Sequence, residues 1–355
     1  MKKIFVPILI LSIGLSACHK DADTNEDNFD ELKTTVLANF TNTVALRNYE
    51  QLNTKASSFK SAIETLGSST TENNLTAAKS AWKDLRSTWE QAEGFLFGPV
   101  EDNDYDPNMD TWPTDYAQMD SLLNSTNPLS TTDVQALTLS LRGYHPIEYI
   151  LFGDHGSRTA ASITDRQKTY MLSLATDLQQ TCNDLYLSWS TAPVNYANEV
   201  INAGNGSTTF STKKEAYLAI AGAMIAICEE VGEGKMKEPF DAMDPQLVES
   251  PYSGNSVADF KNNLIGLQNV YLCSFNGQSG KGISNLVAAK NISLNNQIKD
   301  QIQTAINSFD NITMNYEEAI INQRPLCQQT MNALATLKTT LESQLLPFIL
   351  QYITN

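Results

Sequence analysis

Apolar residues recur at intervals of three and four along most of the chain, and this spacing predicts helices. Alternating apolar and polar runs typical of strands are scarce, and the Asn205-Gly206 and Asn276-Gly277 pairs lie in polar loops rather than between β-branched runs. The pattern therefore predicts an all-α fold, with long helices at 28–66, 73–97, 132–152, 162–191, 212–231, 255–275, 293–311 and 328–352.

Capping signals mark several of these helix ends. Ser69-Thr70-Thr71-Glu72, Ser130-Thr131-Thr132-Asp133 and Ser211-Thr212 are typical of helix starts, and Gly98, Gly153 and Gly232 of helix stops. The stretch 192–211 has the composition of a linker, with helices on either side. We therefore expect two antiparallel four-helix bundles, at 28–191 and 212–355.

The first residues have the character of an export signal. Lys2 and Lys3 precede a short apolar run that ends on Leu15-Ser16-Ala17-Cys18, which resembles a lipobox. We expect a signal peptide at 1–17, lipidation of Cys18 and a polar tether at 18–27. An ordinary signal peptide with an incidental cysteine is the alternative. The expected location is the cell envelope, on either face of the outer membrane, with the lipid as the only membrane anchor.

Charge and cysteines narrow the function classes. The net charge of −16 becomes −18 without Lys2 and Lys3, which disfavours nucleic acid as a partner and favours cations. The remaining cysteines are widely spaced, without a CxxC pair, so a zinc ribbon is excluded. We expect either disulfides or buried thiols at Cys182, Cys228, Cys273 and Cys327.

A short repeat singles out two glutamates. The segment Trp89–Gly98 aligns with Tyr144–Gly153, and Leu-Phe-Gly ends both segments. Glu93 then aligns with Glu148. Because the long connection 99–131 lets the chain return across the bundle, both helices can run parallel. In that arrangement the two carboxylates lie at the same pole.

A histidine and a glutamate form the candidate chemical motif. His145 and Glu148 are three residues apart, so on a helix they share one face and can hold one cation. Gly143 and Pro146 flank the histidine, and Pro146 requires the helix to kink or restart. A histidine that only packs in the core is the alternative for this pattern.

The motif Gly143-x-His145-x-x-Glu148 resembles the hallmark of the imelysin family of bacterial envelope proteins. Other segments share the resemblance, and they are Ala81-Trp82, Arg86, Trp89, Glu93–Pro99, Trp112-Pro113, Glu229–Pro239 and Glu249–Phe260. The resemblance implies two similar four-helix bundles, a functional site near their interface and a link to iron uptake. Members were once classed as metallopeptidases.

The sequence argues against a zinc peptidase. A catalytic zinc of the His₂Glu type needs a second histidine, and both the HExxH and the HxxEH patterns are absent. His155, the last histidine, lies beyond Gly153, where the helix is expected to end. An oxygen-rich set with one imidazole suits iron better than copper, with zinc as the alternative.

We expect His145 and Glu148 as the core ligands, Glu93 as the third and Asp115 as a further candidate that could equally be a helix cap or a solvated acid. Residues expected around them are Gly143, Tyr144, Pro146, Arg86, Trp89, Trp112 and Ser253. Arg86 is expected to pair with a buried carboxylate, with binding of an anionic chelator as its alternative role.

The hypothesis that follows is a lipid-anchored protein that binds iron or an iron-bearing ligand for uptake and passes it to an envelope transport partner. A metal-dependent peptidase is the second hypothesis. A structural or adaptor lipoprotein, in which the motif only packs, is the third.

Overall fold

The computed structural model describes residues 23–353, and these are almost entirely helical, as predicted. The expected signal peptide and Cys18 lie outside the described residues. Helix α1 begins at Asp23, so the polar stretch 18–27 is partly helical rather than wholly a tether. None of the helices within 23–353 combines the length and apolar character that crossing a bilayer requires.

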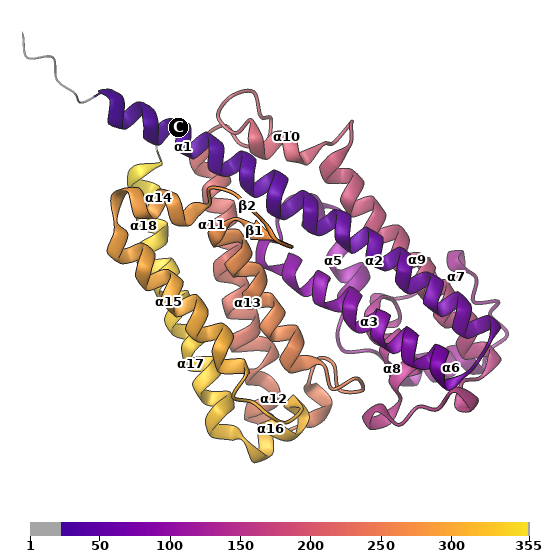
Figure 1. The fold of residues 1–355 in the computed structure, drawn as a ribbon. Coiled ribbons are helices and arrows are strands. Elements are labelled where there is room, and N and C mark those ends of the chain that lie inside the picture. Colours follow the sequence, from indigo (N-terminus) through magenta and orange to yellow (C-terminus); the bar gives the residue numbers. More distant parts are fainter. Residues whose placement is uncertain (1–22, 354–355) are drawn as a thin grey trace, which may run out of the picture.

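In the N-terminal half, α2 packs against both α3 and α9, and shorter helices cover these three (Figure 1). A π-helical segment, Phe40–Ala45, joins α1 to α2 without a break. The helices of this half are α1 Asp23–Asn39, α2 Leu46–Ser68, α3 Glu72–Ala92, α4 Pro99–Asp102, α5 Tyr105–Asp110, α6 Tyr116–Asn124, α7 Thr131–Gln135, α8 Tyr144–Phe152 and α9 Asp165–Ser190.

Four long helices, α11, α13, α15 and α17, contact one another in a ring in the C-terminal half (Figure 1). The remaining elements are a connecting helix, short helices and a small hairpin. The bounds are α10 Tyr196–Ile201, α11 Lys213–Glu229, α12 Lys237–Ala242, α13 Ser256–Leu272, β1 Ser274–Phe275, β2 Gln278–Ser279, α14 Ile283–Lys290, α15 Ile292–Phe309, α16 Tyr316–Asn322, α17 Arg324–Thr340 and α18 Leu346–Tyr352.

Several predicted helix starts are confirmed by their caps. The Thr71 side chain accepts a hydrogen bond from the backbone N–H of Asn74, and Ser130 with Asp133 and Thr212 with Glu215 form reciprocal capping boxes. The 192–211 stretch contains α10, whose Tyr196 packs on Trp189.

Some predicted elements are wrong. A single helix over 132–152 is replaced by α7, a short 3₁₀ turn and α8, because Gly143 takes a positive φ of 77°. The expected stop at Gly232 is a π-helical segment, Glu230–Lys235, that leads into α12. Asn276-Gly277, expected in a loop, is the turn of the β1–β2 hairpin.

The two halves meet mainly where α3 packs along α13. The four cysteines from Cys182 to Cys327 are buried thiols that form no disulfide with one another. Of the two alternatives expected from the sequence, disulfides or buried thiols, the structure has buried thiols. The candidate site lies where α3, α5 and α8 face the C-terminal half.

Candidate metal centre

The local backbone around His145 fixes where its side chain points. Gly143 precedes α8, and a Cβ at this position would lie 1.9 Å from the Met109 carbonyl oxygen, so only glycine allows this approach of α8 to the end of α5. The helix restarts at Tyr144, as Pro146 predicts. Pro146 lies in the first turn of α8, where its missing N–H costs no helical hydrogen bond. His145 is thereby held fully buried.

Glu148 holds one side of the His145 ring. Its Oε2 lies 3.3 Å from His145 Nδ1, and its Oε1 accepts hydrogen bonds from Tyr252 N at 3.2 Å and from Ser253 N and Oγ, each at 2.8 Å. Both oxygens of Glu148 are therefore engaged. The carboxylate orients the imidazole, and it ties α8 to the loop before α13.

The other ring nitrogen faces Asp110, at the end of α5. His145 Nε2 lies 3.0 Å from Asp110 Oδ1, which is the distance of an ion pair when the imidazole is protonated. The second Asp110 oxygen accepts a hydrogen bond from Trp89 Nε1 at 2.6 Å. The Trp112 ring packs on the imidazole with 4.9 Å between ring centres.

Electrostatics keep this pair charged in the absence of a bound cation. Burial alone would lower the pKa of His145, but the Asp110 and Glu148 carboxylates outweigh it and raise the pKa to about 9. Burial alone would raise the pKa of Asp110, and the Arg86 guanidinium with His145 reverses this and holds the pKa well below its usual range. A cation that binds His145 Nε2 must therefore displace a proton.

Arg86, on α3, is the central fixed charge. It is fully buried, its guanidinium carbon lies 5.0 Å from the centre of the Tyr144 ring, and its Nη1 contacts Asp110 Oδ1. Its Nη2 lies 2.8 Å from Glu249 Oε1 and also contacts Glu90, and Asp259 is 4.0 Å from Nε. The expected pairing of Arg86 with a buried carboxylate is confirmed, and the guanidinium joins acids from both halves.

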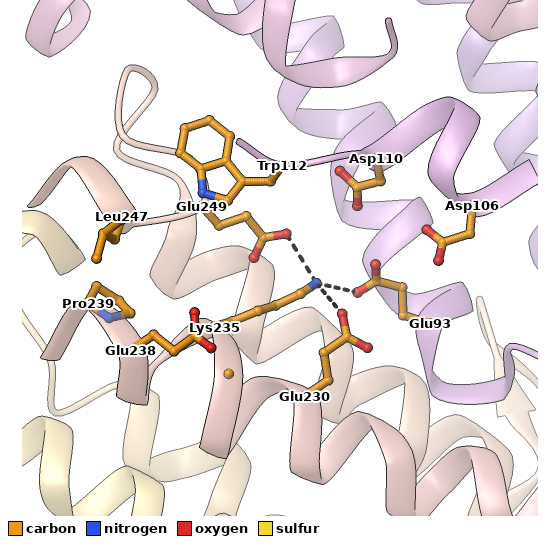
Figure 2. Close-up of a pocket in the computed structure, with 11 residues that line it drawn as sticks. Glu93, Asp106, Asp110, Trp112, Glu230, Lys235, Glu238, Pro239, Leu247 and Glu249 are labelled. Carbon is orange, nitrogen blue, oxygen red and sulfur yellow. Dashed lines mark hydrogen bonds and ion pairs between the residues drawn. The ribbon is translucent and has the colours of Figure 1, made fainter. Parts of the chain in front are cut away.

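A pocket of about 270 Å³ opens beside this cluster, and Lys235 lies in it (Figure 2). The Lys235 ammonium lies 3.0 Å from Glu93 Oε2, 3.1 Å from Glu249 Oε1 and 3.2 Å from Glu230 Oε1. Glu93 also accepts a hydrogen bond from the Asn263 side chain at 2.5 Å. Glu93 therefore binds a lysine here and does not contact His145.

Two groups of side chains have the spacing of metal ligands. One ligand atom from each of Asp110, His145 and Glu249 lies within 4.8 Å of the others, and the same holds for Glu90, Glu93 and Asp110. In the first group, His145 Nε2 faces Asp110, and Glu249 Oε2 is buried without a hydrogen-bond partner among the described residues. Glu90 Oε1 in the second group also lacks a hydrogen-bond partner there. Because the first group is the one of the two that includes an imidazole, it is the candidate metal centre.

The predicted residues have different places in this geometry. Glu148 joins neither group, although it touches His145. Asp115 stands apart, because its carboxylate caps α6 by accepting hydrogen bonds from the Gln118 backbone N–H at 2.9 Å and from the Gln118 side chain at 2.7 Å. Trp89, Trp112, Tyr144 and Ser253 all contact the cluster as described above.

Five residues of the cluster were not predicted from the sequence, and they are Asp110, Glu249, Glu90, Asp259 and Lys235. Glu249, Asp259 and Lys235 lie inside the segments that carry the family resemblance, and Asp110 lies two residues before Trp112-Pro113. The charged residues in and beside those segments were therefore the signal in the sequence that pointed to them.

The chain is similar to known proteins over most of its length. The imelysin family matches residues 45–344. Iron-regulated protein A of Synechococcus elongatus is 29% identical over 321 residues, which is 87% of this chain and 85% of that protein.

Two solved structures share the fold. A protein of Parabacteroides distasonis, provisionally described as an iron-regulated protein A precursor, has a TM-score of 0.83 at 24% identity, covering 91% of this chain and 95% of that one. An imelysin-like protein of Psychrobacter arcticum has a TM-score of 0.71 at 13% identity, covering 98% and 100%. The resemblance carried by Gly143, His145 and Glu148 is therefore confirmed, and this chain belongs to the imelysin family.

Proposed function

We propose that this protein is a lipid-anchored envelope protein that binds iron, or a small iron-bearing ligand, for uptake. Asp110, His145 and Glu249 supply the ligand atoms at the interface of the two halves. Glu148 orients His145, and Arg86 holds the acids in register. Cys18 carries the lipid that keeps the protein at the outer membrane.

The observation that carries this proposal is the convergence of Asp110, His145 and Glu249, whose ligand atoms lie within 4.8 Å of one another, with Glu249 Oε2 buried and without a hydrogen-bond partner among the described residues. Burying a carboxylate oxygen without a partner costs free energy that a shared cation would recover. The three side chains are at most 6% exposed, so a bound ion would be largely shielded from water.

The charge of the surrounding cluster also supports a cation. Arg86 and Lys235 face a larger number of buried carboxylates. Burial, and after it the neighbouring Glu90 carboxylate, raise the pKa of Glu93 and of Asp259 well above the usual range. A divalent or trivalent ion would supply the missing positive charge.

The donor set and the relatives favour iron. One imidazole nitrogen with carboxylate oxygens is a set that suits iron or zinc better than copper. The Synechococcus relative is named for iron regulation, and so is the Parabacteroides structure. A role in iron handling would account both for these names and for the acidic cluster around His145.

Binding is favoured over peptide hydrolysis. A zinc peptidase needs further protein ligands and a base beside an open metal position. His155, the remaining histidine among the described residues, has a side chain that is 83% exposed.

Metal titration by calorimetry tests the proposal. The protein as isolated, freed of metal, is titrated with ferrous, ferric and zinc ions next to its His145→Ala and His155→Ala variants. We expect stoichiometric binding of iron that His145→Ala abolishes and His155→Ala preserves, with circular dichroism confirming the fold of both. Equal binding by the two variants would refute the metal centre. Peptide hydrolysis that requires the metal and His145 would favour the peptidase instead.

The lipid anchor is tested separately. Cells are fed a clickable fatty acid, and label on the protein is compared with that on Cys18→Ala. We expect label and membrane association in the natural sequence and neither in the variant. Label that persists in Cys18→Ala would contradict anchoring at this residue.

A further inference from the structure

A second concave region lies between the two halves, next to the Lys235 pocket. It consists of two adjoining cavities of about 730 and 500 Å³, which share His155, Pro245, Pro251, Tyr252 and Glu317 as lining residues. Cavities of this size accept small molecules. We call it the tyrosine groove, because Tyr116, Tyr149 and Tyr252 line its larger part.

Glu317 is the unusual residue of this groove. It is only 8% exposed, and neither of its carboxylate oxygens has a hydrogen-bond partner among the described residues. A buried carboxylate without a partner is costly, and an ionised one much more so. It lines both cavities of the groove, so a ligand there can reach it.

The three tyrosines form one wall. Their rings pack with centres 5.0 Å apart for Tyr149 and Tyr252, 5.1 Å for Tyr116 and Tyr149, and 5.4 Å for Tyr116 and Tyr252. Tyr252 lines both cavities and therefore lies next to Glu317 in the lining. Aromatic faces attract cations through their ring quadrupole, so the wall and the carboxylate favour the same kind of ligand.

The other charged residues of the groove have the same preference. Asp154, Asp244 and Glu318 also line it, and no lysine or arginine is among its lining residues. An anionic ligand would meet only repulsion here, apart from a protonated His155. Apolar surface is provided by Trp112, Leu247 and three prolines, which a purely inorganic cation would leave uncovered.

We propose that the tyrosine groove binds a small organic cation, with an ammonium group at Glu317 and an apolar body on Tyr252 and its neighbours. The ammonium would give Glu317 the hydrogen-bond donors it lacks. This inference goes beyond the iron-binding proposal and does not depend on it, because Glu317 belongs to neither group of candidate metal ligands.

The groove is nevertheless in contact with the candidate metal centre. Trp112 and Leu247 line both the groove and the Lys235 pocket, and Trp112 packs on His145 (Figure 2). Tyr252 donates its backbone N–H to Glu148. A molecule in the groove therefore touches residues that hold His145, and its binding alters the surroundings of the Trp112 indole.

Binding of two matched probes tests the proposal. The protein as isolated, kept metal-free with a chelator, is titrated at about pH 8 with phenethylamine and with phenethyl alcohol, which carries a hydroxyl in place of the ammonium. Glu317 has a pKa of about 7, so it is mostly ionised there. We expect the amine to bind about tenfold more tightly than the alcohol, as a cation on a carboxylate and an aromatic face should.

A glutamate outside the groove provides the control. Glu317→Gln should remove the preference for the amine, whereas Glu342→Gln, which changes an exposed glutamate that lines neither cavity, should keep it. Tyr252→Leu should weaken the amine more than the alcohol. Equal affinities for both probes, no binding of the amine up to millimolar concentration, or a preference that survives Glu317→Gln would each overturn the proposal. Binding of a lysine-rich peptide without binding of the amine would also overturn it, in favour of a protein partner.

Discussion

Gly94 and Gly266 bring the backbones of the two halves into direct contact. A Cβ at Gly94 would lie 2.6 Å from the Gly266 carbonyl carbon, and a Cβ at Gly266 would lie 2.2 Å from the Gln91 carbonyl oxygen. Neither position has room for a methyl group. The end of α3, which carries Glu90, and the 3₁₀ turn that follows it from Glu93 are therefore set against α13 by the absence of side chains at these two residues.

We predict that Gly266→Ala lowers the free energy of unfolding by about 3 kcal/mol, because the clash is with backbone and only a shift of α13 relieves it. Gly222→Ala is the matched control. Gly222 lies in α11 with nothing within 4 Å of an added Cβ, so this change should stabilise the protein by about 0.5 kcal/mol or more. Urea unfolding measures both, and equal effects would contradict the close approach of the halves.

Arg86 should be as important for stability as for the site. We predict that Arg86→Met costs about 3–5 kcal/mol of unfolding free energy, because it leaves Glu90, Asp110 and Glu249 buried without their shared cation. Arg47→Met removes a similar side chain whose pair with Glu50 is on the surface, with the arginine 60% exposed. That control should change stability by less than about 1 kcal/mol. A small effect of Arg86→Met in thermal or urea unfolding would show that the acids are not ionised together.

The metal centre makes a different prediction for two aspartates. Asp110→Asn should weaken iron binding at least about tenfold, because an amide is a poorer ligand than a carboxylate and the site loses a negative charge. Asp115→Asn should leave binding unchanged, since asparagine also caps α6 and Asp115 stands outside the cluster. Calorimetric titration compares the two, and a loss of binding in Asp115→Asn would restore this residue as a ligand.

Glu317 predicts a dependence of stability on pH. Burial raises its pKa in the folded protein to about 7, from an ordinary value of 4.5. The folded state therefore retains the proton better than the unfolded chain, and this contribution to stability is complete below pH 4.5 and lost as the pH rises through 7. The loss corresponds to about 3 kcal/mol for a shift of this size.

Variants isolate that contribution. Relative to the natural sequence, Glu317→Gln should gain about 3 kcal/mol of unfolding free energy between about pH 4 and pH 8. Glu342→Gln, which changes an exposed glutamate that lines neither cavity of the tyrosine groove, should show no such gain. Other titratable groups near Glu317 contribute equally to both measurements, and they are Glu148, Asp154, His155, Asp244 and Glu318. Parallel curves for the natural sequence and Glu317→Gln would show that the carboxylate is not buried alone.

The number of reactive thiols tests whether Cys18 carries a lipid. Cys182, Cys228, Cys273 and Cys327 are buried thiols, so we predict that none reacts with Ellman's reagent in the folded protein and that a reductant leaves the melting temperature unchanged. After unfolding, four thiols should react if Cys18 carries a lipid thioether, and all five if it does not. Fewer than four would indicate a disulfide.

Local signals in the sequence predicted the helices well. Caps such as Thr71, Ser130 and Thr212 act over three or four residues, so the sequence shows them directly. The break at Gly143 was harder to predict, because the positive φ follows from the close approach of Met109, which is distant in the sequence. The π-helical segment Glu230–Lys235 likewise continues a helix past Gly232, where glycine indicated a stop.

The residues of the site likewise differ in whether the local sequence or a distant contact places them. His145 and Glu148 are neighbours on one turn, and their contact was predictable from spacing alone. Asp110 and Glu249 reach His145 and Arg86 only through the packing of α5 and of the loop before α13, so no spacing in the sequence brings them together. Glu93 and Glu148 both face the C-terminal half, but the repeat that relates them says nothing of their partners, Lys235 for one and Ser253 for the other.

Lys235 gives the protein a cation of its own at the mouth of the candidate centre. Because the ammonium is tethered to the chain, its effective concentration beside Glu249 is set by the geometry of the side chain rather than by the ions in the medium. Any ion that bonds to Glu249 from this pocket competes with that ammonium, so loading is an ion exchange and the affinity measures the difference between two cations. The same lysine can return to the carboxylate as the ion leaves, which lowers the cost of release to an acceptor.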